Sequence, residues 1–169
     1  SRRRQRQMCI RDRLEAHAFD NGQMVYDFNL LKGHVRDLID AFDHSIALWS
    51  GDAPDYLNAM RAHSERWVLI PVSPSAEQFS RLFFRLVDTT LSLTDMVNGE
   101  SDVRLHSVIA HETETGYAQC FREDADNPRM GLIDLNDIQF SPAITAEWSD
   151  SALFDRLKRG ERSVNPKNL

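Results

Sequence analysis

The sequence has few of the residues and patterns that several protein classes require. Two cysteines among 169 residues are too few for a disulfide-stapled scaffold or a four-cysteine zinc site. No apolar run approaches the roughly 20 residues that a transmembrane helix needs. We also find no glycine-rich phosphate loop and no internal repeat. These absences favour a protein that does not enter a membrane, and we expect it in the reducing cytoplasm.

Positive charge is also scarce over most of the chain. The formal net charge is −6, yet residues 1–13 hold six arginines and only one aspartate. Residues 14–169 therefore carry 14 basic and 25 acidic side chains, a net charge of −11. Such an acidic body disfavours nucleic acid as a partner.

The arginine-rich start needs its own explanation. Arg3 to Asp12 match, residue for residue, one reading frame of a transposase adapter used to prepare DNA sequencing libraries. We therefore interpret residues 1–13 as a disordered segment left by that adapter. A basic arm that grips phosphates and an ordinary solvated terminus are the alternatives. On the adapter interpretation, the protein is truncated at its N-terminus.

The rest of the chain predicts one α+β domain. Helical spacing of apolar residues predicts helices over 29–42 and 76–93, and Ser75 is placed to cap the second with Gln78 as its capping-box partner. Residues 103–113 and 117–122 predict a β-hairpin. We expect an antiparallel sheet with two main helices packed on one face. Residues 14–124 form the domain, and residues 125–169 are a C-terminal extension of it. Weaker signals predict a strand end at 14–19, strands at 67–72 and 132–140, and short helices at 54–62 and 151–158.

Two short acidic motifs could carry chemistry. Asp43 precedes His44 where the first helix should end, and a carboxylate beside an imidazole can orient it for proton transfer. Glu112 lies at the tip of the predicted hairpin, where its carboxylate could accept two hydrogen bonds from a guanidine-like edge. Taken alone, such residues are more often a cap or solvated pair at a helix end and an exposed acidic turn.

Together with two further motifs, these residues resemble a known family. The motifs are Gly-x-Met-Val-x-Asp-Phe at Gly22 to Phe28, Asp43-His44, Pro74-Ser75-Ala76-Glu77, and Glu112-Thr113. Their order and spacing are similar to the 6-pyruvoyl-tetrahydropterin synthase family, specifically its 6-carboxy-tetrahydropterin synthase branch in queuosine biosynthesis. The match spans roughly Leu14 to Phe121.

The resemblance implies a fold, an assembly and a reaction. The fold is the tunnelling fold (T-fold), whose subunits form ring-like homo-oligomers, commonly hexamers, with active sites between subunits. The reaction is a lyase reaction on 7,8-dihydroneopterin triphosphate by zinc-assisted proton transfer. Asp43 and His44 are implied as the catalytic proton relay. Glu112 is implied as the anchor of the pterin ring, with Thr113 beside it.

The resemblance also exposes a mismatch. The family binds zinc through three histidines, two of them in a His-Gly-His motif, and uses a nearby cysteine. These positions would precede Arg13, where the adapter-like segment stands. We therefore assign no metal ligand, expect zinc only in an intact parent, and expect this truncated chain to be inactive. The alternatives are a 6-pyruvoyl-tetrahydropterin synthase and a non-catalytic pterin-binding paralogue.

Overall fold

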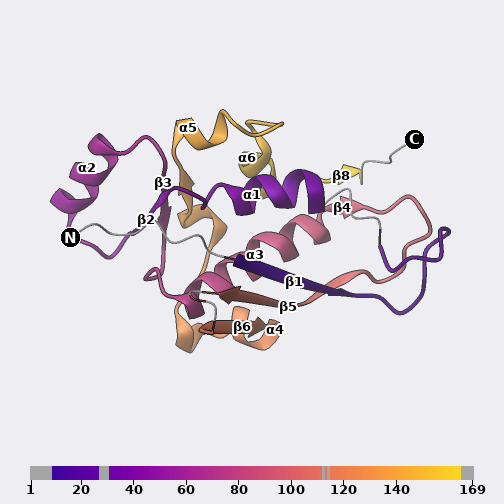
Figure 1. Ribbon diagram of the computed structural model, residues 1–169. Helices are drawn as coiled ribbons and strands as arrows, with labels where there is room; N and C mark the ends of the chain where they lie inside the picture. Colours follow the sequence, from indigo (N-terminus) through magenta and orange to yellow (C-terminus); the bar gives the residue numbers. More distant parts are fainter. Residues whose placement is uncertain (1–8, 27–30, 112, 114, 165–169) are drawn as a thin grey trace.

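An antiparallel sheet lies on one side of the protein. The computed structural model describes residues 9–26, 31–111, 113 and 115–164. This sheet has the strand order β1-β5-β6, formed by Cys9–Glu15, Arg104–His111 and Tyr117–Phe121 (Figure 1). The predicted hairpin is confirmed, because β5 and β6 pair from Ser107 opposite Phe121 to His111 opposite Tyr117.

Strand β1 corrects the predicted start of the chain. Residues 9–13 were expected to be disordered, but they lie in β1 and pair with β5. The predicted strand end at 14–19 stops at Glu15. Alternation explains the strand: Ile10 and Leu14 pack against the core, whereas Arg11 and Arg13 remain exposed. The alternation of inward apolar and outward charged side chains is the pattern of a half-buried strand, and it accommodates the arginines of this segment on the exposed face.

The helix α3, Ala76–Ser92, confirms the second predicted helix. Oγ of Ser75 accepts a hydrogen bond from the backbone N–H of Gln78 at 3.2 Å, so Ser75 is the N-cap as predicted. The side chain of Gln78 does not return this contact, since its Nε2 donates to the carbonyl of Met130 at 2.7 Å. The predicted capping box is therefore only half formed. Leu82 and Leu86 are completely buried where α3 packs against the sheet.

The first predicted helix is interrupted. A helical segment η1, Leu31–Val35, is kinked at Gly33, whose φ of −100° and ψ of −106° are not helical. The regular helix α1 covers only Arg36–Asp40, and a turn follows. The continuous helix predicted over 29–42 is therefore wrong at Gly33, because glycine has no side chain that would restrict the backbone there. Residues 29 and 30 of the predicted helix lie outside the described residues.

A second, mixed sheet lies beside the first helix. Strands β2 (Ile46–Trp49) and β3 (Trp67–Ile70) run parallel, and β7 (Gln139–Phe140) is antiparallel to β3. The crossover helix α2, Pro54–His63, has no buried residue and projects from the rest of the protein (Figure 1). The predicted strand at 132–140 is wrong except for β7. Instead, short 3₁₀ turns precede it: η2 (Pro128–Met130) and η3 (Leu135–Asp137).

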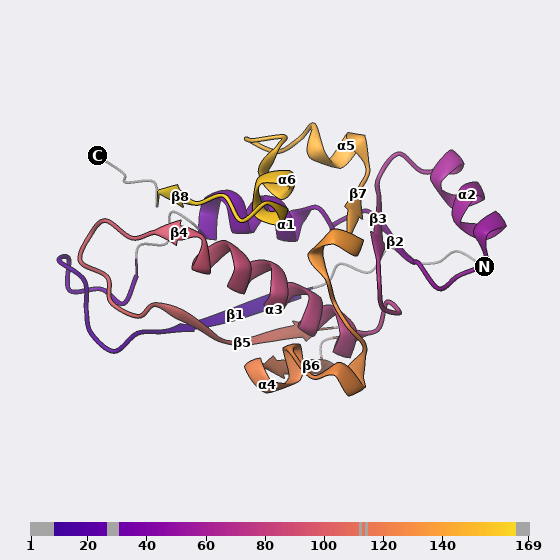
Figure 2. The same cartoon turned by 180° about the vertical axis from the view of Figure 1, so that it is seen from behind.

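The C-terminal segment packs into the same core as the rest of the chain. Its elements are α4 (Arg122–Ala125), α5 (Pro142–Thr145), α6 (Leu153–Lys158) and β8 (Ser163–Val164), which pairs in parallel with β4 (Thr94–Asp95). Phe140 contacts Phe42, Trp148 and Phe154 edge to face, with centroids 4.9–5.8 Å apart. Figure 2 shows α6 next to α1. The α+β class is thus confirmed, although the described strands form three sheets. No helix in the described ranges is long and apolar enough to cross a membrane.

Candidate functional site

The Asp43–His44 pair occupies the turn after α1. Nε2 of His44 lies 3.6 Å from Oδ2 of Asp43, so the two side chains predicted to act together are in contact. His44 has a φ of +52°, in the left-handed region that costs a non-glycine residue roughly 1–2 kcal/mol. The His44 side chain is 67% exposed and that of Asp43 is 44% exposed. The pair is therefore open to a ligand or to a second protein chain.

The surrounding structure holds this turn in place. The ring of Phe42 packs edge to face on Phe83 with centroids 4.9 Å apart, and Oγ of Ser45 donates to the carbonyl of Phe42 at 3.0 Å. Nη2 of Arg66 donates to the carbonyls of Asp40, at 3.3 Å, and Asp43, at 3.1 Å. Sequence reasoning missed Arg66, because its partners are backbone carbonyls 26 and 23 residues away.

The predicted pterin anchor is only partly visible. Glu112 lies outside the described residues. Thr113 closes the β5–β6 turn: its Oγ accepts a hydrogen bond from the N–H of Gly116 at 2.8 Å, and its own N–H donates to the Gly116 carbonyl at 3.2 Å. Among the hydrogen bonds and ion pairs of the described residues, none joins Thr113 to Asp43 or His44. The structure thus brings together one half of the predicted site.

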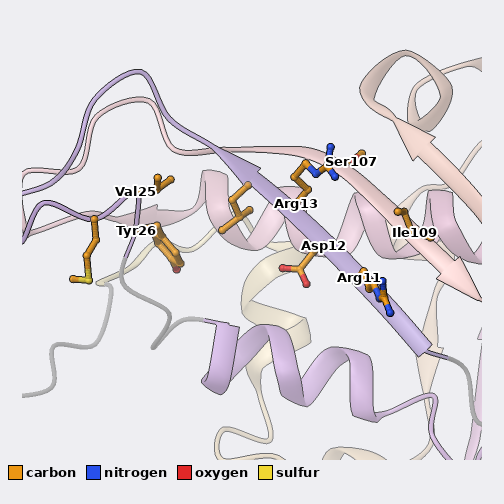
Figure 3. Close-up of a pocket in the computed structure, with 9 residues that line it drawn as sticks. Arg11, Asp12, Arg13, Val25, Tyr26, Ser107 and Ile109 are labelled. Carbon is orange, nitrogen blue, oxygen red and sulfur yellow. The ribbon is translucent and has the colours of Figure 1, made fainter.

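A cavity of about 690 Å³ lies elsewhere, along β1. Its walls come from Arg11–Leu14 of β1, from Ser107 and Ile109 of β5, and from the segment 24–26. Figure 3 shows these side chains. Oδ2 of Asp12 is buried without a hydrogen-bond partner among the described residues. None of the predicted site residues that the structure describes lines this cavity.

The described residues do not fit the zinc site that the family resemblance implies. No group of three or more histidine, cysteine, aspartate or glutamate side chains is arranged to hold a metal ion in the part of the chain that the structure describes. Cys120 is buried on β6. Burial raises the pKa of its thiol to about 12, with a further increase from Asp124. The Cys120 thiol is therefore protonated near neutral pH in the metal-free protein, where it does not serve as a base.

Known proteins match most of the chain. The sequence model described as 6-pyruvoyl tetrahydropterin synthase matches residues 10–123, from β1 to α4. Two similar relatives are 6-carboxy-5,6,7,8-tetrahydropterin synthases from Helicobacter pylori strains J99 and 26695, which are 29% and 28% identical over 150 residues. Each match covers 88% of this chain and 75% of the relative. These matches are longer than residues 1–123, so they extend into the C-terminal segment.

Proposed function

Since the chain belongs to the 6-pyruvoyl tetrahydropterin synthase family, we propose that it is a 6-carboxy-5,6,7,8-tetrahydropterin synthase-like lyase acting on 7,8-dihydroneopterin triphosphate. The observation that carries this proposal is the contact between Asp43 and His44 at 3.6 Å, inside the matched region. The similarity to two synthases of that name supports the choice of branch.

The side chains have distinct proposed roles. The imidazole of His44 transfers a proton to or from the pterin side chain, and the carboxylate of Asp43 holds the ring in its productive orientation. The carboxylate of Glu112 accepts hydrogen bonds from the guanidine-like edge of the pterin. The described residues provide no zinc site, so the proposed roles concern these side chains only.

A homo-oligomer, such as the hexamer that the resemblance implies, is part of the proposal. The exposure of Asp43 and His44 supports a site that a second copy of the chain completes. An enclosed site needs walls that exclude water, and the cavity along β1 does not include this pair.

A second candidate is a non-catalytic pterin-binding protein. Such a protein needs neither the three histidines nor the cysteine that the family resemblance implies, and the described residues contain no group of three or more side chains arranged to hold a metal ion. Both candidates place the pterin at Glu112, but only the lyase requires His44.

Incubation of the purified chain with 7,8-dihydroneopterin triphosphate tests both candidates. Mass spectrometry identifies a 6-carboxy or a 6-pyruvoyl product, and a fluorescence titration measures pterin binding. We expect His44→Asn to reduce turnover by roughly 10²–10⁴-fold with little change in binding. Glu112→Gln should weaken binding by about 10-fold or more.

The matched control is His63→Asn, which alters an exposed histidine on α2 and should change neither quantity. Binding without turnover would favour the non-catalytic candidate. A chain that neither binds nor converts the pterin would contradict both.

A further inference from the structure

Arg66 connects three segments that are far apart in the sequence. It lies just before β3, and its side chain is only 22% exposed. Nη2 donates to the carbonyls of Asp40 and Asp43, while Nη1 forms an ion pair with the carboxylate of Glu147. Its own backbone carbonyl accepts a hydrogen bond from the N–H of Ile46 at 3.0 Å. One guanidinium group therefore joins the turn after α1 to the C-terminal segment.

The contact with Asp43 has a specific geometric consequence. The carbonyl of Asp43 belongs to the peptide group that also contains the N–H of His44, so holding this oxygen fixes the orientation of that peptide. Rotation of the peptide would change ψ of Asp43 and φ of His44 together. His44 has its strained φ of +52° at this point, and such a conformation persists only where its surroundings enforce it.

We propose that Arg66 is a positioning residue that holds the peptide between Asp43 and His44, and thereby sets the direction in which the imidazole faces the pterin. This inference rests on the proposed function, because it concerns the proton relay of that reaction. A cation also suits the carbonyls at the end of a helix, where partial negative charge accumulates.

The ion pair with Glu147 has a secondary part in this arrangement. Glu147 is 61% exposed, and exposed ion pairs contribute roughly 0–1 kcal/mol to stability. The ion pair with Glu147 instead orients the guanidinium of Arg66 toward the turn after α1. A second link lies nearby, where Oδ2 of Asp37 accepts hydrogen bonds from the N–H and Oγ of Ser149 at 3.2 and 2.9 Å. The C-terminal segment therefore supports the turn from outside.

Arg66→Met tests the proposal, since methionine keeps an apolar stem and removes the guanidinium. The matched control is Arg85→Met on α3, which removes the ion pair between Arg85 and Asp126. Steady-state kinetics with 7,8-dihydroneopterin triphosphate should show kcat reduced by about 10- to 100-fold in Arg66→Met, with KM unchanged. Arg85→Met should match the wild type. Equal kcat values for Arg66→Met and the wild type would overturn the proposal.

A second measurement needs no substrate and separates this proposal from the proposed function. Backbone chemical shifts of His44, measured by NMR on histidine-labelled protein, report whether its φ is positive. We expect the positive-φ signature in the wild type and in Arg85→Met, and its loss in Arg66→Met. If the wild type shows no turnover, as we expect of a chain whose described residues provide no zinc site, the His44 shifts alone decide the positioning role. Loss of pterin binding would instead count against the proposed function.

Unchanged His44 shifts in Arg66→Met would overturn the positioning role. Arg66→Lys serves as the second variant if Arg66→Met does not fold. It retains the charge but not the planar fork of donors, so its His44 shifts should change in the same direction by a smaller amount. Shifts equal to those of the wild type in Arg66→Lys would also count against the proposal.

Discussion

Replacing Arg81 by methionine should destabilise the protein more than most single substitutions. Arg81 lies on α3 and is only 4% exposed. The five N–H groups of its guanidinium face six acceptors, one on the side chain of Gln78 at 2.8 Å and the others backbone carbonyls between residues 124 and 131. The three carbonyls that Nη2 contacts share its two hydrogens. These bonds, 2.7–3.2 Å long, attach the start of the C-terminal segment to the central helix.

The expected magnitude follows from what the substitution leaves behind. A hydrogen bond to a charged group contributes roughly 1.5–3 kcal/mol, but bonds that share one group are not additive. Burial also has a cost, since desolvation lowers the pKa of Arg81. Removing one partner from a buried charged network typically costs about 3–5 kcal/mol. We therefore expect Arg81→Met to reduce the free energy of unfolding by about 4 kcal/mol.

Urea unfolding followed by circular dichroism measures this change. With a slope of about 2 kcal/mol per molar urea, the midpoint should fall by about 2 M. Arg85→Met is the matched control on the same helix, because it removes only an ion pair of 3.1 Å with Asp126. Its cost should stay below about 1 kcal/mol. Arg81→Lys should recover only part of the loss, since a single ammonium cannot reach all six acceptors. A loss in Arg81→Met no larger than in Arg85→Met would refute the reasoning.

Two further predictions concern other buried groups. Asp20 accepts hydrogen bonds from two backbone amides of its own turn and from the side chain of Asn98 at 3.0 Å. Asp20→Ala should therefore lower the free energy of unfolding, measured in urea, by about 2–4 kcal/mol. A smaller loss in Asp20→Ala than in Asn98→Ala would contradict this account. In a Cys9→Ser background, the buried thiol of Cys120, with its pKa raised to about 12, should react with a thiol reagent at pH 8 only after unfolding. Because the pKa of Cys120 in the folded protein exceeds the usual value of 9.0, the free energy of unfolding should fall as pH rises from about 9 toward 12. If the protein with Cys120 and the Cys120→Ala variant show the same dependence of this free energy on pH, the linkage is excluded.

The elements that sequence reasoning predicted correctly are those with local signals. The helix α3 combines an N-cap at Ser75 with a continuous apolar stripe, and both are encoded within a few residues. The β5–β6 hairpin likewise depends on neighbouring strands and one turn. The adjacency of Asp43 and His44 is a property of the sequence itself, and the turn after α1 brings their side chains into contact.

The errors arose where a distant segment decides the local structure. The adapter match led us to expect residues 9–13 to be disordered, yet β5 supplies their hydrogen-bond partners almost a hundred residues later. The parallel pair of β2 and β3 also has no local signature, since the helix α2 separates the two strands. Gly33 permits a kink, but local sequence does not show whether the chain uses it.

The family motifs, the central helix and hairpin, and the neighbouring carboxylate and imidazole of the proposed relay all follow from the order of residues along the chain. Only the tertiary structure revealed that Arg66 donates to the carbonyl of Asp43 and that Arg81 attaches the C-terminal segment to the central helix. The physical reason is that both arginines donate mainly to backbone carbonyls, at separations of 23 to 50 residues. Every residue has such a carbonyl, so no pattern of side chains marks the partner, and folding alone selects it.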